Sequence, residues 1–349
     1  MMKSERVAYI DIAKGFVLLL VIFGHTFRDS MREAYYWCDF SYLFLYKFHG
    51  SSLFLLSGVS YAITAQKNKS LSLPLYLKKK AKSILLPWVS YSVLVYIIFF
   101  AVSKIPVLSG ALGGKGVVSP IEYLQLMLYN QNPYSFHLWY LNTLFLLSVF
   151  TFLIDRFSDE KNARVLKFGI LIIIPGIAST VAQPWHLVTK GFVYQLPYFI
   201  IGTLIKRDTF EKSCHKWITA GGLSAVLLAV HTILEPSYDF SAIGNVAVFY
   251  IENILAVLVA FGIISASYAF SSRLSFVEKI GRNSMVYYLY HQPFCCAFLG
   301  VLLYDKLCFP VILVIVICMI VSIVVPYFIS KIAKRTGLHK ILRYIGLPS

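Results

Sequence analysis

The residues best suited to chemistry lie in the first apolar stretch of the chain, at about residues 10–27. This stretch carries Asp11, Lys14 and His25 in an otherwise apolar run. Ionisable groups are costly inside a bilayer, so their presence there predicts a functional site. On a helix, Lys14 and His25 point the same way to within roughly 20°, and Asp11 lies within roughly 40° of that face. An acid, a base and an imidazole therefore share one stripe about 20 Å long.

The imidazole of this stripe is the candidate for proton transfer. Imidazole accepts a proton near neutral pH, so His25 suits the activation of a weak nucleophile such as a hydroxyl group. Asp11 lies roughly 20 Å from His25 along a straight helix, so the two cannot form a dyad. Structural alternatives stay open: Lys14 can extend to the lipid headgroups with Asp11 as its ion-pair partner. His137 fits an interfacial position, and His291 fits a hydrogen bond to a neighbouring helix.

The composition of the chain is that of an integral membrane protein. Of its 349 residues, 58% are hydrophobic and only 14% are charged, whereas a soluble domain has about 25% charged residues. The net charge of +16 comes from residues in short segments between apolar runs, which argues against nucleic-acid binding. The six cysteines show no metal-ligand spacing, so we expect no metal site. No signal-peptide cleavage site follows the first apolar run, so we expect a retained helix.

The apolar runs predict an all-α, polytopic protein with about ten transmembrane helices in a single domain over residues 1–349. Between the third and fourth runs, glycines and prolines predict an outer loop at about 103–136, with a short amphipathic helix near 120–129. A basic tail follows at about 331–349. The ten expected spans are about 8–27, 47–65, 84–102, 137–154, 166–182, 190–205, 217–234, 245–270, 284–304 and 308–330.

The distribution of basic residues orients these spans. With the N-terminus inside, 24 of the 32 lysine and arginine residues fall in inner segments and 7 in outer ones. Short cytoplasmic loops carry an excess of lysine and arginine. We therefore expect both termini to be cytoplasmic, with Asp11 and Lys14 near the inner end of the first span and His25 near its outer end.

Five sequence elements, in this order along the chain, resemble the acyltransferase-3 family of integral membrane acyltransferases. The opening around Asp11 resembles the start of that family, and its Arg-x10-His pattern appears here as Lys14-x10-His25. The second apolar run ends in Ser57-Gly58, as in the family. This chain has Lys14 where the family has an arginine. Lysine cannot bind an anion in the bidentate manner of arginine, but it keeps the positive charge.

The remaining three elements lie further along the chain, and the resemblance covers residues from Arg6 to about Tyr327. One element again has lysines where the family has arginines. The three elements are Tyr76-x-x-Lys79-x-x-Lys82, His137-Leu-Trp139-Tyr-Leu141, and Gly281-Arg-Asn283-Ser284 followed by Tyr288-Leu-Tyr-His291.

The resemblance implies a function. Such a protein is a multi-pass protein of the inner (cytoplasmic) membrane. It moves an acyl group, usually acetyl, from cytoplasmic acyl-CoA to a sugar hydroxyl of a cell-surface or lipid-linked glycan. Acyl-CoA would be a co-substrate, and no bound cofactor is expected. The expected partners are the glycan acceptor, membrane lipid and the glycan-synthesis machinery, with no nucleic acid.

The site residues implied by the resemblance fall into two groups. His25 and Asp11 are the candidate catalytic residues, and a larger set is expected to bind donor or acceptor. This second set comprises Lys14, Ser57, Gly58, Lys79, Lys82, His137, Asn283, Ser284 and His291.

Alternative functions and mechanisms stay open from the sequence alone. A transporter or flippase for a lipid-linked saccharide would also need polar groups within a helical bundle, and a non-catalytic scaffold for a glycan synthase is a third reading. Whether His25 deprotonates the acceptor or carries the acyl group itself is open. The identity of the acyl group, acetyl or succinyl for example, is open as well.

Overall fold

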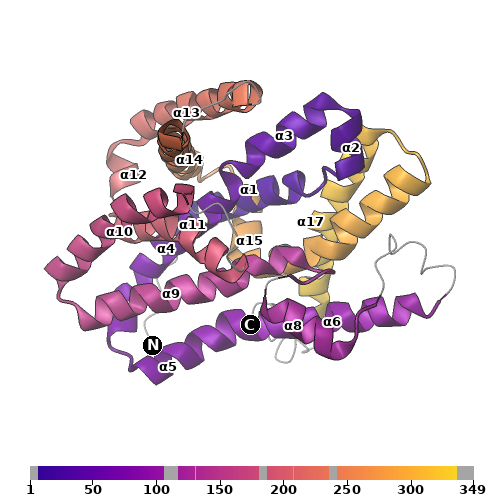
Figure 1. Cartoon of the computed structure of the whole chain (residues 1–349), viewed down its shortest axis with the longest axis horizontal. Helices are drawn as coiled ribbons and strands as arrows, with labels where there is room; N and C mark the ends of the chain where they lie inside the picture. Colours follow the sequence, from indigo (N-terminus) through magenta and orange to yellow (C-terminus); the bar gives the residue numbers. More distant parts are fainter. Residues whose placement is uncertain are drawn as a thin grey trace.

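The architecture is all-α, as the apolar periodicity predicts (Figure 1). The computed structural model describes residues 7–105, 117–129, 131–180, 187–206, 208–235 and 242–335, and no strand occurs among them. The expected outer loop and basic tail therefore lie partly outside the described residues. The described part of that loop contains α8 (Pro120–Leu128), where the sequence predicts a short helix.

Each of the ten expected spans coincides with a helix or with a run of consecutive helices. Shorter helices connect them: α2 (Asp29–Ala34), α3 (Tyr36–Tyr46), α12 (Thr209–Lys212) and α15 (Ser275–Arg282). The ten are α1 (Ala8–Gly24), α4 (His49–Lys69), α5 (Leu73–Lys80) with η1 (Ala81–Leu85) and α6 (Leu86–Ser103), η3 (Phe136–Leu138) with α9 (Trp139–Phe157), α10 (Glu160–Thr180), α11 (Leu187–Leu204), α13 (Cys214–Leu234), α14 (Ala242–Ala269), α16 (Ser284–Tyr290) with η5 (His291–Phe298) and η6 (Val301–Lys306), and α17 (Val311–Arg335).

Six of these segments, among the described residues, are long and apolar enough to cross a membrane by length and composition. They are the segments Leu73–Ser103, Phe136–Phe157, Cys214–Leu234, Val246–Ala269, Ser284–Lys306 and Val311–Ile332. The chain is thus a multi-pass membrane protein, while the number of ten spans stays a prediction.

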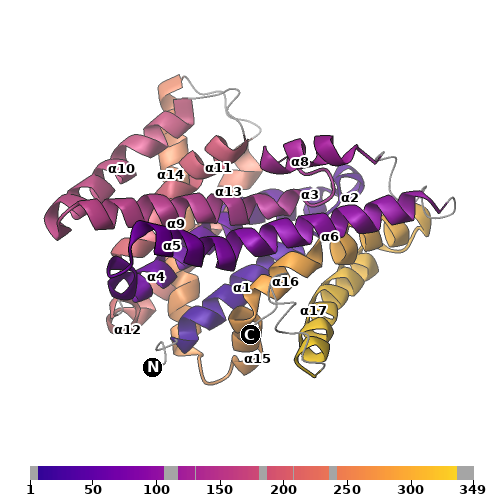
Figure 2. The same ribbon diagram turned by 90° about the horizontal axis from the view of Figure 1, so that it is seen from below.

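Helix α1 lies in the middle of the bundle, next to α4, α14, α15 and α3 (Figures 1 and 2). A helix that is apolar on every side is typically buried by other helices. Buried residues of α1 accordingly lie all around its circumference, for example Ile12, Ala13, Val17 and Ile22. The candidate residues of the first span are therefore carried by the central element of the fold.

Glycines allow the closest helix contacts. A Cβ added to Gly281 of α15 would overlap the carbonyl oxygen of Asp11 on α1. In the same way, a Cβ on Gly58 of α4 would overlap the carbonyl oxygen of Phe199 on α11, where Gly202 faces it. Small residues let membrane helices pack at short range, where dispersion attraction is strongest. These contacts fix α15 against α1 and α11 against α4.

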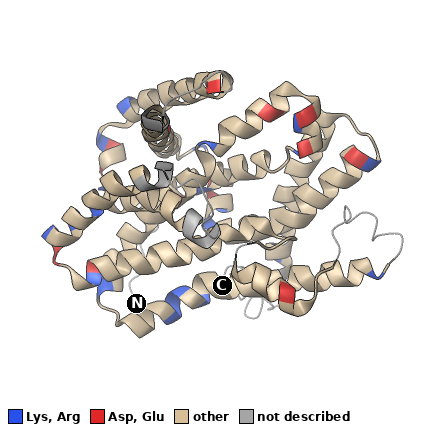
Figure 3. Cartoon of the chain, in the orientation of Figure 1, with Lys and Arg blue, Asp and Glu red and all other residues tan. Residues whose placement is uncertain are grey.

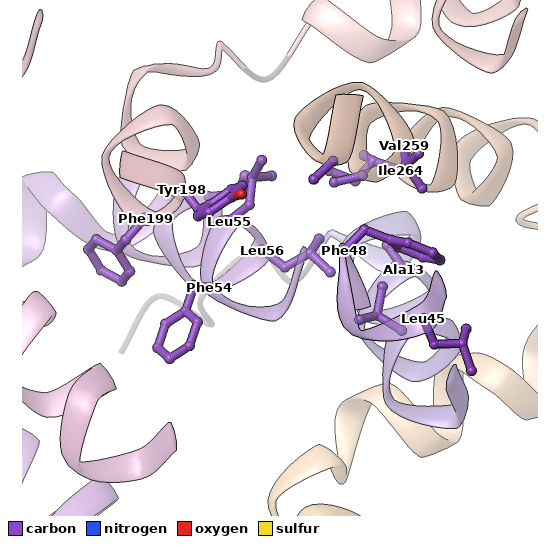
Figure 4. Close-up of a cluster of buried hydrophobic side chains, with 14 of the residues drawn as sticks. Ala13, Leu45, Phe48, Phe54, Leu55, Leu56, Tyr198, Phe199, Val259 and Ile264 are labelled. Carbon is purple, nitrogen blue, oxygen red and sulfur yellow. The ribbon is translucent and has the colours of Figure 1, made fainter. Parts of the chain in front are cut away.

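Apolar side chains fill the space around α1 and α4. Figure 4 shows Phe54, Leu55 and Leu56 of α4 together with Tyr198 and Phe199 of α11. Within lipid, such packing holds helices together mainly through van der Waals contact, because lipid tails are as apolar as the side chains. The same cluster also contains Ala13, Leu45, Phe48, Val259 and Ile264.

Charged residues are sparse along the helices and gather in separate places (Figure 3). Basic residues occur on α5, and acidic residues occur on α2 and α3, on the opposite side of the bundle. Helix α5 ends in Lys78, Lys79 and Lys80. Lysines therefore cluster on α5, whereas α2 and α3 carry acidic residues beside Arg32.

Candidate active site

His25 caps the C-terminal end of α1 and is only half-buried. Its Nδ1 atom lies 3.3 Å from the hydroxyl oxygen of Tyr46, at the end of α3. On another side, the His25 ring meets the ring of His291, with 5.3 Å between their centroids. The candidate base is thus held between an exposed tyrosine and a buried imidazole.

A third imidazole continues this row. The ring of His137, in η3, lies 5.1 Å from the ring of His291. His291 is completely buried, and His137 is 6% exposed. The hydroxyl of Tyr288 donates a hydrogen bond to the backbone carbonyl of His137, which ties η3 to α16. Residues from three distant parts of the sequence, His25, His137 and His291, therefore meet in one cluster.

A break in the helical chain follows directly after His291. Helix α16 ends at Tyr290, and Gln292 has extended backbone angles of φ −125° and ψ 150°. Pro293 has no N–H. It therefore cannot donate the hydrogen bond that the Leu289 carbonyl would accept from it in an α-helix. The break thus ends α16 beside the His137 segment, which the Tyr288 hydroxyl contacts.

A cavity of about 220 Å³ lies on the other side of this cluster. Two lysine side chains, Lys14 of α1 and Lys80 of α5, line it. Hydroxyl groups supply most of the other polar surface, which gives the cavity a positive and hydrogen-bonding character. The hydroxyl-bearing lining residues are Ser57, Ser60, Tyr61, Thr64, Tyr140, Ser148, Ser284 and Tyr288.

One hydrogen-bond pair in the cavity wall has a defined direction. Ser57 donates its hydroxyl proton to the Leu53 carbonyl, at 2.8 Å. Its oxygen also lies 2.8 Å from the Tyr140 hydroxyl. Since Ser57 has one proton and has already used it, Tyr140 must donate to Ser57. Both hydroxyl oxygens therefore keep lone pairs that can accept hydrogen bonds from a bound molecule.

Tyrosine rings separate the cavity from the histidines. Tyr288 lines the cavity, and its ring centroid lies 5.2 Å from that of Tyr140. The same ring lies 5.5 Å from His137 and 5.9 Å from His291. Tyr288 therefore links the cavity that Lys14 and Lys80 line to the imidazole cluster.

The structure places Asp11 away from the cavity and the imidazole cluster. Its Oδ2 atom lies 3.8 Å from the Nε atom of Arg282, on α15. Asn283, which follows Arg282, donates a hydrogen bond of 2.7 Å to the Lys279 carbonyl. Asp11 and Asn283 thus belong to the α1–α15 contact, whereas Ser284, the next residue, lines the cavity.

Other expected binding residues also have defined places. Lys79 and Lys82 are exposed and do not line the cavity, and Lys79 donates to the Asn68 side chain at 3.0 Å. Gly58 packs against α11 rather than facing the cavity. Of the residues expected from sequence, Lys14, Ser57 and Ser284 line the cavity, and His25, His137 and His291 form the imidazole cluster.

The sequence reasoning missed four residues of this arrangement: Tyr46, Lys80, Tyr140 and Tyr288. The chain has 24 tyrosines, so no single one stands out by type. The family-like element Tyr76-x-x-Lys79-x-x-Lys82 points to Lys79 and Lys82 and passes over Lys80 between them. The only available signal was that Tyr140 and Tyr288 lie within the family-like elements.

One set of metal-ligand side chains lies close together in the described part of the chain. His231, Glu235 and Glu252 have ligand atoms within 4.8 Å of one another. The ammonium group of Lys47 already lies 2.8 Å from Glu235 and 2.5 Å from Glu252. This cluster joins α13, α14 and the end of α3 as an ion-pair network, and it is separate from the cavity and from the imidazole cluster.

Comparison with known proteins identifies the family. Neither the curated proteins nor the solved structures gave a match to this chain. A family model described as an acyltransferase domain matches residues 7–331, and this range includes the cavity and the imidazole cluster. The chain therefore belongs to the acyltransferase-3 family, and it is a multi-pass membrane acyltransferase.

Proposed function

We propose that this protein transfers an acetyl group from cytoplasmic acyl-CoA to a sugar hydroxyl of a cell-surface or lipid-linked glycan, in the inner membrane, with both termini cytoplasmic. The observation that carries the proposal is that Tyr288 both lines the lysine-containing cavity and contacts the imidazole cluster that includes His25. The cavity offers an anion-binding end and His25 a proton-accepting end, with the rings of Tyr288 and His291 between them.

The lysine-lined cavity suits the donor. Lys14 and Lys80 supply two positive charges at its wall, and lysine binds phosphate as a point charge. The volume of about 220 Å³ lies below the ~300 Å³ from which small-molecule pockets usually start. It therefore takes only part of the donor: the acyl end must extend past the Tyr288 ring to reach His25, while the nucleotide stays outside near the basic residues of α5.

The opposite side of His25 suits the acceptor. Tyr46, which contacts His25, is 40% exposed, while His137 and His291 are buried. A sugar hydroxyl can thus approach His25 past Tyr46 and need not pass through the donor cavity. The two substrates then reach the reaction centre from two sides.

The reaction balances with His25 as general base. His25 takes the proton of the sugar hydroxyl while the oxygen attacks the thioester carbonyl carbon. The new C–O bond forms, the C–S bond breaks, and CoA leaves as a thiolate. The proton then passes from the His25 imidazolium to the thiolate, which gives an O-acyl sugar and free CoA.

The first test compares wild type with His25→Ala, with His215→Ala as the matched control because His215 is an exposed histidine on α13. Each form would be expressed at the same level in a knockout of the source organism. Ester-linked acyl groups on surface glycans are then measured after mild alkaline release. We expect esters with wild type and His215→Ala and none with His25→Ala.

The other outcomes separate the alternatives. If the knockout retains all glycan esters, the acyltransferase proposal for those glycans is wrong, and transport of a lipid-linked saccharide becomes the better reading. If the knockout loses the esters but His25→Ala restores them, the function stands and His25 is not its base.

A second measurement distinguishes a base from an acyl carrier. Purified protein is mixed with acyl-CoA in the absence of any sugar, and free CoA is measured on the time scale of a single turnover. A general base releases no CoA until an acceptor is added. A burst of CoA equal to the amount of enzyme would instead show that a residue of the protein carries the acyl group.

A further inference from the structure

His291 is a buried titratable group, and acyl transfer with His25 as the base assigns it no role. Its side chain is 0% exposed. Its Nδ1 atom lies 3.1 Å from the backbone carbonyl oxygen of Tyr287. Its Nε2 atom is buried and has no hydrogen-bond partner among the residues that the structure describes. A buried polar atom without a partner costs free energy, so its retention calls for a physical reason.

The contact with Tyr287 fixes the tautomer of the ring. A carbonyl oxygen only accepts hydrogen bonds, so the Nδ1 atom of His291 must carry the proton. In the neutral ring, Nε2 then has a lone pair and no hydrogen. This buried nitrogen can therefore accept a hydrogen bond but cannot donate one.

The surroundings of the ring restrict what the lone pair can meet. Among the described residues, three aromatic side chains lie against the His291 ring: the imidazoles of His25, on α1, and His137, on η3, and the phenol of Tyr288, on α16. Tyr288 donates its proton to the His137 carbonyl. His25 is the half-buried member of this group, so its ring is the least confined.

We propose that His291 is a positioning residue, whose Nε2 lone pair accepts a hydrogen bond from the imidazolium that forms on His25 during acyl transfer. The proposal rests on the proposed function, because it assigns His291 a part in that same reaction. His291 would do for His25 what a buried carboxylate does for the histidine of a hydrolase triad.

The hydrogen bond between His25 and His291 requires no reactant beyond the acyl donor and the sugar. One nitrogen of His25 takes the sugar hydroxyl proton, and the other nitrogen, which carries an N–H, turns toward Nε2 of His291. The hydrogen bond stabilises the positive charge while the C–O bond forms and the C–S bond breaks. The proton then goes from His25 to the departing thiolate, the hydrogen bond to His291 is released, and both rings are neutral again.

The size of the effect follows from hydrogen bonds to charged groups, which correspond to about 10- to 100-fold in rate. Substitution of His291 should lower kcat by this factor and leave the KM values for both substrates nearly unchanged, because in this proposal His291 acts on His25 and not on the substrates. His291→Gln, whose side-chain oxygen can accept a hydrogen bond, should keep more activity than His291→Ala.

The decisive experiment is chemical rescue of purified His291→Ala in detergent, with acyl transfer measured in the presence of added imidazole or thiazole. The two molecules have similar shape, but the nitrogen of thiazole is a much weaker hydrogen-bond acceptor. We expect imidazole to restore kcat and thiazole to fail. Equal rescue by both would show that the ring only fills space, and it would overturn the proposal.

A control addresses loss of packing. Leu303 is a buried residue of η6, on the same segment as His291 but away from the imidazole cluster. Leu303→Ala should lower the unfolding temperature without the kcat loss of His291→Ala. If Leu303→Ala reproduces that kcat loss, the effect comes from the packing of the segment and the proposal is wrong.

Failure of the inference is distinguishable from failure of the proposed function. If wild type transfers no acyl group, the proposed function fails and the inference falls with it. If wild type is active and His25→Ala is not, but both His291 variants keep the wild-type kcat, only the role of His291 is refuted.

Discussion

Substitution of Gly58 by alanine tests how closely α4 and α11 must pack to shape the cavity. The added Cβ would overlap the Phe199 carbonyl oxygen and lie 3.1 Å from the Cα atom of Gly202. Both neighbours are backbone atoms, so no side chain can turn aside and the two helices must separate. Overpacking of this kind typically costs about 1–3 kcal/mol, while the better helix propensity of alanine returns up to ~1 kcal/mol. We expect a net loss of about 1–2 kcal/mol in the free energy of unfolding.

The matched control lies on the same helix. A Cβ added to Gly50 would meet no atom within 4 Å, so Gly50→Ala should leave stability unchanged or raise it slightly. Thermal unfolding in detergent gives the comparison, and acyl transfer gives a second readout. Gly58→Ala should also lower activity, because its neighbour Ser57 holds the contact with Tyr140 in the cavity wall. Equal unfolding temperatures for Gly58→Ala and Gly50→Ala would refute the reasoning.

Two further predictions concern hydroxyl and ion-pair contacts. Tyr46→Phe removes the hydroxyl that contacts the proposed base, so we expect about a 3- to 10-fold lower kcat in acyl transfer; an unchanged kcat would show that the hydroxyl has no part in the reaction. Asp155→Asn breaks an ion pair of 2.8 Å with Lys167 in which both side chains are 10% exposed or less, and it should destabilise by about 3 kcal/mol. The exposed pair of Glu160 and Arg164 is the control, since Glu160→Gln should change the unfolding free energy by less than about 0.5 kcal/mol; similar losses in both variants would contradict this account.

The helical architecture could be predicted because each apolar run is long and is bounded by charged or turn-forming residues. Hydrophobic length in a membrane protein depends on the bilayer and hardly on tertiary contacts. The shared face of Lys14 and His25 could also be predicted from the sequence, since it depends only on helical periodicity. Lys14 does line the cavity, and His25 does meet other histidines.

The contact between His25 and His291 could not be predicted in the same way. The two residues are far apart in sequence, and His291 lies at the C-terminal end of α16, before the extended residue Gln292. A helical wheel orders the side chains of one helix, but it does not say which face of another helix they meet. Only the three-dimensional structure brings the two rings together.

The lysines of α5 show the same limit on a smaller scale. The expected pair, Lys79 and Lys82, is exposed, whereas Lys80 lines the cavity. A π-helical turn, Ala81–Leu85, follows Lys80 directly. Such a turn has a wider hydrogen-bond ring than an α-helix and therefore changes which side chains share a face. Spacing rules at 100° per residue therefore fail for Lys82, which lies inside this turn. Lys79 and Lys80 both precede the turn, and as neighbours on α5 they point about 100° apart.

The glycine-mediated contact between α4 and α11 has a consequence for how the protein is made. Membrane insertion selects segments one at a time by their apolarity, and neither helix is among the six segments that qualify by length and composition in the described residues. Their packing faces are complementary to each other, yet more than a hundred residues separate the end of α4 at Lys69 from the start of α11 at Leu187. During synthesis, α4 is therefore made well before α11, and the contact between them cannot form until α11 has been made. The cavity wall also includes Ser284 and Tyr288 of α16, so the cavity is complete only after most of the chain has left the ribosome.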